Sequence, residues 1–311
     1  TIQSSGIYTR TIGGNCIGPC GNAGNVSINT GSLSLGSGSQ INSGTSSSGQ
    51  GGSISVNAGN TISLSGTLST GQPGGIQSRT IGTASNSGAG GNIDLTAGQS
   101  VTISNGASVS ASSTGAGDAG NITVQGLASP PQSVLIDGPG SGIFTDTQGT
   151  GAGGNIFVNA NSVMLQNGGT LSAKTSGTEP TATGGTITIQ GSDVQFKTGA
   201  IVTAETSGAG QGGTIDVVAT DNLSLRDASS ISSNSNSLLD NAGSAGVIRL
   251  SAPVIDVQTA LVSASTIGPG NAGTIILEAN QINLGTSETG QLHEQGADIF
   301  TRTTGPGLAG D

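Results

Sequence analysis

The acidic and histidine side chains near the C-terminus are the first residues that could do chemistry. Glu288, His293, Glu294 and Asp298 carry carboxylate oxygens and an imidazole nitrogen, which are donors for divalent metals. Their spacing matches no metal motif, and the Gly-Gly-x-Gly-x-Asp pattern of calcium-binding repeats is absent from the chain. We expect a solvated loop, no cofactor, and at most incidental Ca²⁺ on the acidic surface.

Charged residues at equivalent repeat positions raise the question of catalysis, since glycoside hydrolysis needs two carboxylates about 5–10 Å apart. Asp146, Lys174 and Glu205 hold one position in three successive repeats, and Asp216 and Arg249 hold another in two. Alternating signs on neighbouring strands favour a ladder of surface ion pairs, such as Asp216–Arg249, over an active site. We expect no enzymatic activity. The position of Asp146 is held in other repeats by Arg10, Arg79 and Arg302.

The two cysteines, Cys16 and Cys20, are too few for a four-cysteine zinc site. We expect a disulfide that pins one small loop, which fits a secreted or cell-surface location. The chain begins at Thr1 rather than at Met, which indicates a processed or excerpted N-terminus.

Charge and hydropathy limit the partners. The net charge is −10 over 311 residues, and no cluster of Lys and Arg is present, so nucleic acid and anionic membrane surfaces are disfavoured. No apolar run approaches the roughly 18–20 residues that a membrane helix needs, so we expect no membrane insertion.

A repeated motif, G-x-(G/A)-G-x-I-x-L, must position all of these residues. It recurs about every 32 residues, and a period of that size indicates a solenoid or array in which each unit packs on its neighbours. The whole chain is therefore expected to be one repeat region. The last glycines of the motif are Gly24, Gly52, Gly91, Gly120, Gly154, Gly185, Gly213, Gly246, Gly273 and Gly310.

Each repeat contains three short runs in which apolar and polar residues alternate, such as Ile93–Leu95, Val101–Ile103 and Val109–Ala111. Three short strands with one apolar face each predict a right-handed parallel β-helix of nine to ten coils, with Ile93, Ile122 and Ile156 stacked in register. Asn105-Gly106 and Asn167-Gly168 are also typical of antiparallel hairpins, so a hairpin meander or a propeller is the alternative fold. In a coil the same dipeptide forms a sharp corner, and the Gly-rich motifs are read as corners too. Insertions are expected at 66–75, 125–133 and 285–296.

The chain resembles the repeat regions of filamentous-haemagglutinin-like exoproteins, the large Gly/Ser/Asn-rich members common in cyanobacteria. The units Gly117–Val124 and Asn105–Ala111 carry this likeness, which covers essentially the whole chain. It implies a right-handed parallel β-helix, export by two-partner secretion through an outer-membrane partner, and a role in adhesion or extracellular matrix.

Four apolar residues at outward strand positions are candidates for a lateral contact. Leu135, Phe144, Phe157 and Met164 fall within two adjacent repeats, beside the insertion with Pro130 and Pro131. Either that insertion covers them, or they form a contact in a fibre or with a receptor.

These features predict a secreted structural or adhesive rod of a bacterial surface or matrix, which acts by multivalent presentation. Its expected partners are other copies of itself or flanking coils, and cell-surface or matrix glycans. The alternatives are a filament subunit that stacks end to end, a carbohydrate-active β-helix enzyme, and an ice-binding surface.

Overall fold

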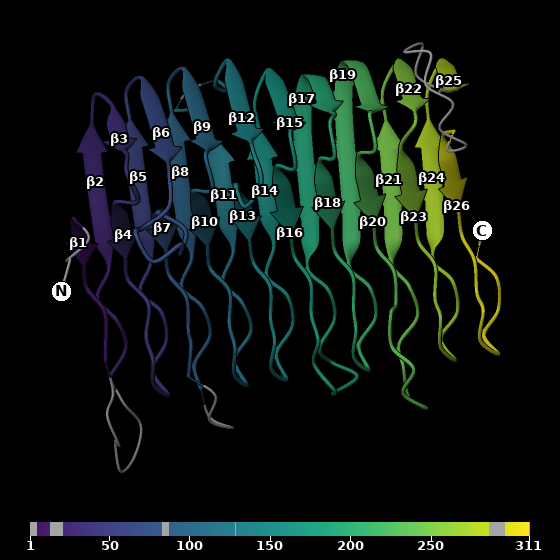
Figure 1. Ribbon diagram of the computed structural model, residues 1–311, viewed down its shortest axis with the longest axis horizontal. Coiled ribbons are helices and arrows are strands. Elements are labelled where there is room, and N and C mark those ends of the chain that lie inside the picture. The colour runs from purple at the N-terminus through teal and green to yellow at the C-terminus, as the bar shows by residue number, and fades with distance from the viewer. Residues whose placement is uncertain (1–4, 13–20, 83–86, 128, 286–295, 311) are drawn as a thin grey trace.

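The computed structural model describes residues 5–12, 21–82, 87–127, 129–285 and 296–310. Every strand pairs in parallel with its counterpart in the next repeat, so the chain winds as a β-solenoid whose coils follow one another along the long axis (Figure 1). Ile122 lies in register with both Ile93 and Ile156. The predicted parallel β-helix with three strands per coil is thus confirmed, and a meander or propeller is excluded.

The first and second strands of the coils form a 16-stranded sheet. In two coils they are continuous, as β17 (Thr186–Phe196) and β19 (Thr214–Arg226), with a bulge between Gly191 and Asp193. The other first strands are β2 (Val26–Thr30), β5 (Ile54–Ala58), β8 (Ile93–Ala97), β11 (Ile122–Gln125), β14 (Ile156–Asn159), β21 (Val247–Ser251) and β24 (Thr274–Glu278). The other second strands are β3 (Leu33–Leu35), β6 (Thr61–Ser65), β9 (Ser100–Ser104), β12 (Ser133–Asp137), β15 (Ser162–Gln166), β22 (Val254–Gln258) and β25 (Gln281–Gly285).

The third strands form a separate 10-stranded sheet, which lies behind the first strands in Figure 1. Its members are β1 (Gly6–Tyr8), β4 (Gln40–Asn42), β7 (Gly75–Gln77), β10 (Ser108–Ser110), β13 (Gly142–Phe144), β16 (Thr170–Ser172), β18 (Ile201–Thr203), β20 (Ser230–Ser232), β23 (Leu261–Ser263) and β26 (Asp298–Phe300). Asn-Gly pairs make the corner before two of these strands. Asn105 and Gly106 have φ of 54° and 81°, the left-handed conformation expected for such corners.

The core is a continuous aliphatic column between the two sheets. The inward residues of all three strands are buried from the second to the eighth repeat, for example Ile156, Leu165 and Leu171. Because strands of the same type stack in register, each aliphatic side chain packs on a similar one in the coils before and after it. Burial is therefore shared between coils.

A Gly-rich arm follows the third strands, where only a corner was expected. The described arms extend below the strands in Figure 1, and a marker glycine ends the return leg. The amide of that glycine donates to the carbonyl of the residue after the third strand of the same coil, as from Gly154 to Thr145 (2.8 Å) and from Gly213 to Ala204 (2.7 Å). The repeated motif is therefore not a corner. It forms the return leg of the arm, and main-chain hydrogen bonds join the two legs at their base.

The outgoing legs of the arms form a fourth ladder, made of single-residue parallel bridges. Most of its hydroxyl side chains are buried, and some of them donate to carbonyl oxygens of the return leg. Thr80 donates to Ala89 O (2.8 Å) and Thr147 to Ala152 O (2.6 Å). The ladder consists of Thr11, Thr45, Thr80, Ser113, Thr147, Thr175, Thr206, Ser235, Thr266 and Thr303.

Candidate functional site

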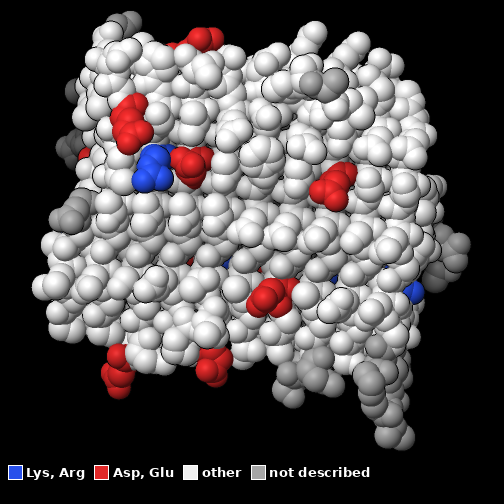
Figure 2. All heavy atoms as spheres, turned by 180° about the vertical axis from the view of Figure 1, so that it is seen from behind, with Lys and Arg blue, Asp and Glu red and all other residues white. Residues whose placement is uncertain are grey.

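A furrow runs along the long axis where the third-strand sheet meets the outgoing legs of the arms. It consists of three depressions, of ≈ 390, ≈ 360 and ≈ 530 Å³ in chain order. The first two share Arg79, and the second and third share Asp146 and Gln148, so the three adjoin one another along the axis. Figure 2 shows the molecule from this side, and parts of red and blue side chains are visible along one line across its middle.

The charged groups of the furrow come from one position of the repeat, the residue just before each residue of the fourth ladder. The parallel bridges of that ladder hold this position in register from coil to coil. Several of its small polar side chains accept a hydrogen bond from the backbone of the next coil, as Asp146 Oδ1 does from Lys174 N (2.8 Å) and Asn234 Oδ1 from Ser265 N (2.7 Å). We call it the furrow column: Arg10, Gly44, Arg79, Ser112, Asp146, Lys174, Glu205, Asn234, Ser265 and Arg302.

The charged residues of the furrow column do not pair with one another. Asp146 also accepts a hydrogen bond from Ser172 Oγ (2.5 Å), and Glu205 is bound by the amides of Asn234 (3.0 Å) and Asn236 (3.1 Å). Lys174 is exposed and, within the described part of the chain, forms no ion pair with either neighbour. Both carboxylates thus bond to residues of the next coil.

The insertion at 66–75 lines one end of the furrow through Leu68 and Gln72. Thr67 and Pro73 form an antiparallel bridge, and Pro73 O accepts hydrogen bonds from the side-chain amides of Gln40 (2.9 Å) and Gln77 (3.1 Å). This small hairpin therefore lies against the outer face of β4 and β7. Burial here lowers the pKa of the Arg79 guanidinium below its ordinary value.

The expected Asp216–Arg249 ion pair is wrong. The two residues are cross-strand neighbours in register, but no ion pair joins them, and the buried Oδ1 of Asp216 has no hydrogen-bond partner. The ion pair that forms among the described residues is Arg226–Asp256, which is diagonal because Arg226 stands opposite Gln258 rather than Asp256. A diagonal offset lets a long arginine reach a short aspartate, whereas a directly opposite arginine extends past it.

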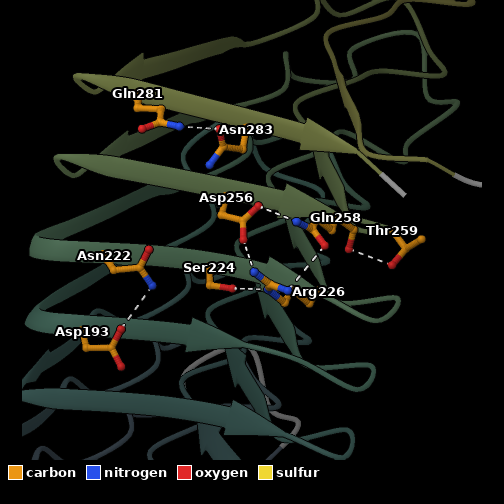
Figure 3. A network of polar contacts seen from close by, with 9 residues as sticks. All are labelled: Asp193, Asn222, Ser224, Arg226, Asp256, Gln258, Thr259, Gln281 and Asn283. Carbon is orange, nitrogen blue, oxygen red and sulfur yellow. Dashed lines mark hydrogen bonds and ion pairs between the residues drawn. The ribbon is translucent and has the colours of Figure 1, made fainter. Parts of the chain in front are cut away.

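Figure 3 shows the network around that pair on the outer face of the second strands. The Asp256 carboxylate, whose residue is 7% exposed, accepts from Arg226 and from Gln258 Nε2 (2.9 Å). Arg226 also donates to Ser224 Oγ (2.9 Å). The arginine is half-exposed and the aspartate is almost fully covered, so the two ends of the pair are not equivalent.

We expect Arg226→Ala to lower the free energy of unfolding by about 1–3 kcal/mol, because it leaves a covered carboxylate without its cation. Asp256→Asn is the matched variant, and we expect a loss of under about 1 kcal/mol, since water can hydrate the half-exposed guanidinium. Urea unfolding of both variants and of the double variant checks this. Equal losses in the two single variants would contradict the asymmetry.

The remaining candidate residues are dispersed. Cys16, Cys20, Glu288, His293 and Glu294 lie outside the described residues, whereas Asp298 begins β26 and is exposed. In the described part of the chain no group of three or more metal-ligating side chains occurs, and no helix is long and apolar enough to span a membrane.

The four residues of the predicted lateral contact lie on different strands. Leu135 and Met164 are side by side in register on β12 and β15. Phe157 is on the first strand β14, and Phe144 is on the third-strand sheet, where it lines the furrow. The structure therefore groups only the first two as direct neighbours.

Comparisons with protein-family models, curated proteins and solved structures found no match.

Proposed function

We propose that this chain is a structural and adhesive rod of a bacterial surface or extracellular matrix, and that its furrow binds extended glycan chains. The observation that supports this most is the extension of the furrow across successive coils, with hydroxyl, amide and charged groups repeated at strand spacing, about 4.8 Å. A linear polymer laid along the axis meets polar groups at successive coils, and many weak contacts then add up to a useful affinity.

The rod itself supports this role, because the stacked core and four ladders keep neighbouring coils in register. A groove built on such a frame loses little conformational entropy when it binds. The carboxylates of the furrow column are held by Ser and Asn side chains, which is a further reason to prefer binding over hydrolysis. Export by two-partner secretion is the route that the exoprotein resemblance suggests.

Binding of an oligosaccharide series of increasing length to the purified chain tests the proposal. We expect no measurable affinity for monosaccharides and a steady increase in affinity with length. Ser207→Trp, at an exposed position in the furrow, should lower affinity at least tenfold by filling the groove. Ser27→Trp, exposed on β2, is the control and should leave binding unchanged. Release of new glycan chain ends would show that the protein is an enzyme. If the protein bound none of the glycans, the adhesive role would be wrong.

A second candidate is a filament that grows by stacking of coils. Ile282 and Leu284 of β25 are 43% and 57% exposed, although their counterparts in β22, Ile255 and Val257, are fully buried. Those aliphatic faces are covered if another coil stacks on them, whether from flanking sequence or from a second copy. Electron microscopy of the purified chain distinguishes the two states: long uniform fibres support assembly, and dispersed short rods count against it.

A further inference from the structure

The first depression of the furrow contains two arginines and no acid. Arg10 and Arg79 belong to the furrow column on either side of Gly44, so their backbones are separated by two strand spacings, about 10 Å. Glycine at the middle position leaves the space between the two side chains empty. A Cβ there would lie 2.4 Å from Arg79 O, so the fold itself excludes a larger residue.

The Arg79 guanidinium is partly buried and has no acidic partner among the described residues. It lines both the first and the second depression beside the 66–75 hairpin, and burial lowers its pKa. Within the described residues its guanidinium forms no hydrogen bond or ion pair, and neither the described lining of this depression nor residues 13–20 and 83–86 include an acidic residue. A buried arginine normally has a partner, because an uncompensated charge is expensive to remove from water. Arg10 is exposed and stacks over the Tyr8 ring (5.0 Å), which keeps it at the rim.

The charged residues are also distributed unevenly along the sequence. Arg10 and Arg79 are the only charged residues before Asp94, whereas the remainder of the chain carries five basic and seventeen acidic residues. The first coils are therefore positive on a protein whose net charge is −10. An anion approaching the rod is repelled by most of its length and attracted at this end.

We propose that the Arg10–Arg79 depression is a subsite for a carboxylate or sulfate group carried by an acidic polysaccharide. Arginine binds planar and tetrahedral oxyanions through paired N–H donors, which Lys does not reproduce. The surrounding Gln40, Asn42 and Ser46 side chains supply amide and hydroxyl groups suited to the hydroxyls of a sugar ring.

An acidic peptide fits this depression less well than a polysaccharide. A peptide in an extended conformation gains affinity by pairing its main chain with an open strand edge. Here the main chain is already used, since Thr9 N donates to Asn42 O (3.0 Å), Thr11 N to Gly44 O (3.2 Å) and Thr45 N to Arg79 O (2.9 Å). Side chains alone face the depression, so recognition has to go through ring hydroxyls and the acidic group.

The choice of a polysaccharide rests on the proposed function, and its test uses titration calorimetry of the full chain with matched oligosaccharides. One set carries uronate groups, a second carries sulfate groups, and a third has the same backbone without charge. We expect at least tenfold tighter binding of one charged set than of the neutral set, and a preference that weakens as salt rises. The stronger set identifies the anion.

Two substitutions locate the subsite. Arg79→Gln should remove most of the preference for the charged set, and Arg10→Gln, at an exposed residue, should reduce it severalfold. Arg302→Gln, in the same column at the other end of the rod, is the control and should change nothing. Circular dichroism confirms that each variant is folded.

The outcomes separate the two proposals. Equal binding of charged and neutral sets, or an undiminished preference in both Arg79→Gln and Arg10→Gln, would overturn the subsite and leave the glycan rod intact. No binding of any set would overturn both. Tighter binding of a glutamate oligomer of equal length, with the same loss in Arg79→Gln, would overturn the choice of a polysaccharide.

Discussion

Gly185→Ala should lower the free energy of unfolding by about 3 kcal/mol or more, although it adds one methyl group. A Cβ at Gly185 would lie 1.9 Å from the carbonyl oxygen of Gly154, the equivalent glycine one coil earlier. Neither atom belongs to a flexible side chain, so the backbones of two coils must separate. The separation weakens the hydrogen bond from Gly185 N to Ala173 O (2.8 Å), which closes the base of the arm.

Chemical unfolding followed by circular dichroism measures this loss, with Gly59→Ala as the matched control. A Cβ at Gly59 would lie 3.8 Å from its nearest neighbour, an ordinary contact, so alanine should be neutral or slightly stabilising there. If both alanines proved equally harmless, the close stacking of the arms would be wrong. The same close approach recurs at every marker glycine from Gly52 to Gly310, where the Cβ would lie 1.8–2.3 Å from a carbonyl oxygen.

Phe196→Ala should cost about 3–5 kcal/mol, because it empties the largest fully buried side chain of the core. Phe196 stands in register with Leu165 on one side and Leu225 on the other, and both are buried. The neighbouring coils are held by their own ladders, so they cannot collapse far into the cavity. We expect a lower unfolding midpoint and faster hydrogen exchange in β15, β17 and β19.

Phe196→Leu is the control for this position. Leucine is the residue found in the same column one coil before and one coil after, so this variant should lose under about 1.5 kcal/mol. If Phe196→Ala were no worse than Phe196→Leu, the shared aliphatic column would not be what holds the coils together. If the faster hydrogen exchange in Phe196→Ala were confined to β17, the stability of a coil would not depend on its neighbours.

The strands and their register were predictable from sequence because one simple pattern carries both. Aliphatic residues two apart define a strand with one buried face, and the repeat places Ile93, Ile122 and Ile156 at matching positions. The two Asn-Gly corners were predictable for a local reason, since their backbone conformation depends on the two residues themselves. The insertion at 66–75 was recognised by length alone.

The arm and the furrow were not predicted, because they depend on contacts between main chains rather than on apolar patterning. Thr175 and Thr206 continue the alternation of β16 and β18 four residues past Leu171 and Val202, and this is a signal that could have revealed the fourth ladder. The Asp216–Arg249 ion pair was predicted wrongly, because sequence position gives the strand neighbour but not the direction of a long side chain. The position of the 66–75 hairpin beside Arg79 was not predictable either, because no local pattern specifies where an insertion packs.

The alignment of all ladders across the long axis has a mechanical consequence. Tension applied along the rod loads every hydrogen bond between two adjacent coils at the same time, so the joint fails as a whole or not at all. Each failure releases one repeat of about 32 residues, which extends to roughly 100 Å. The increments differ in length because the repeats do, from 27 residues between Gly246 and Gly273 to 39 between Gly52 and Gly91.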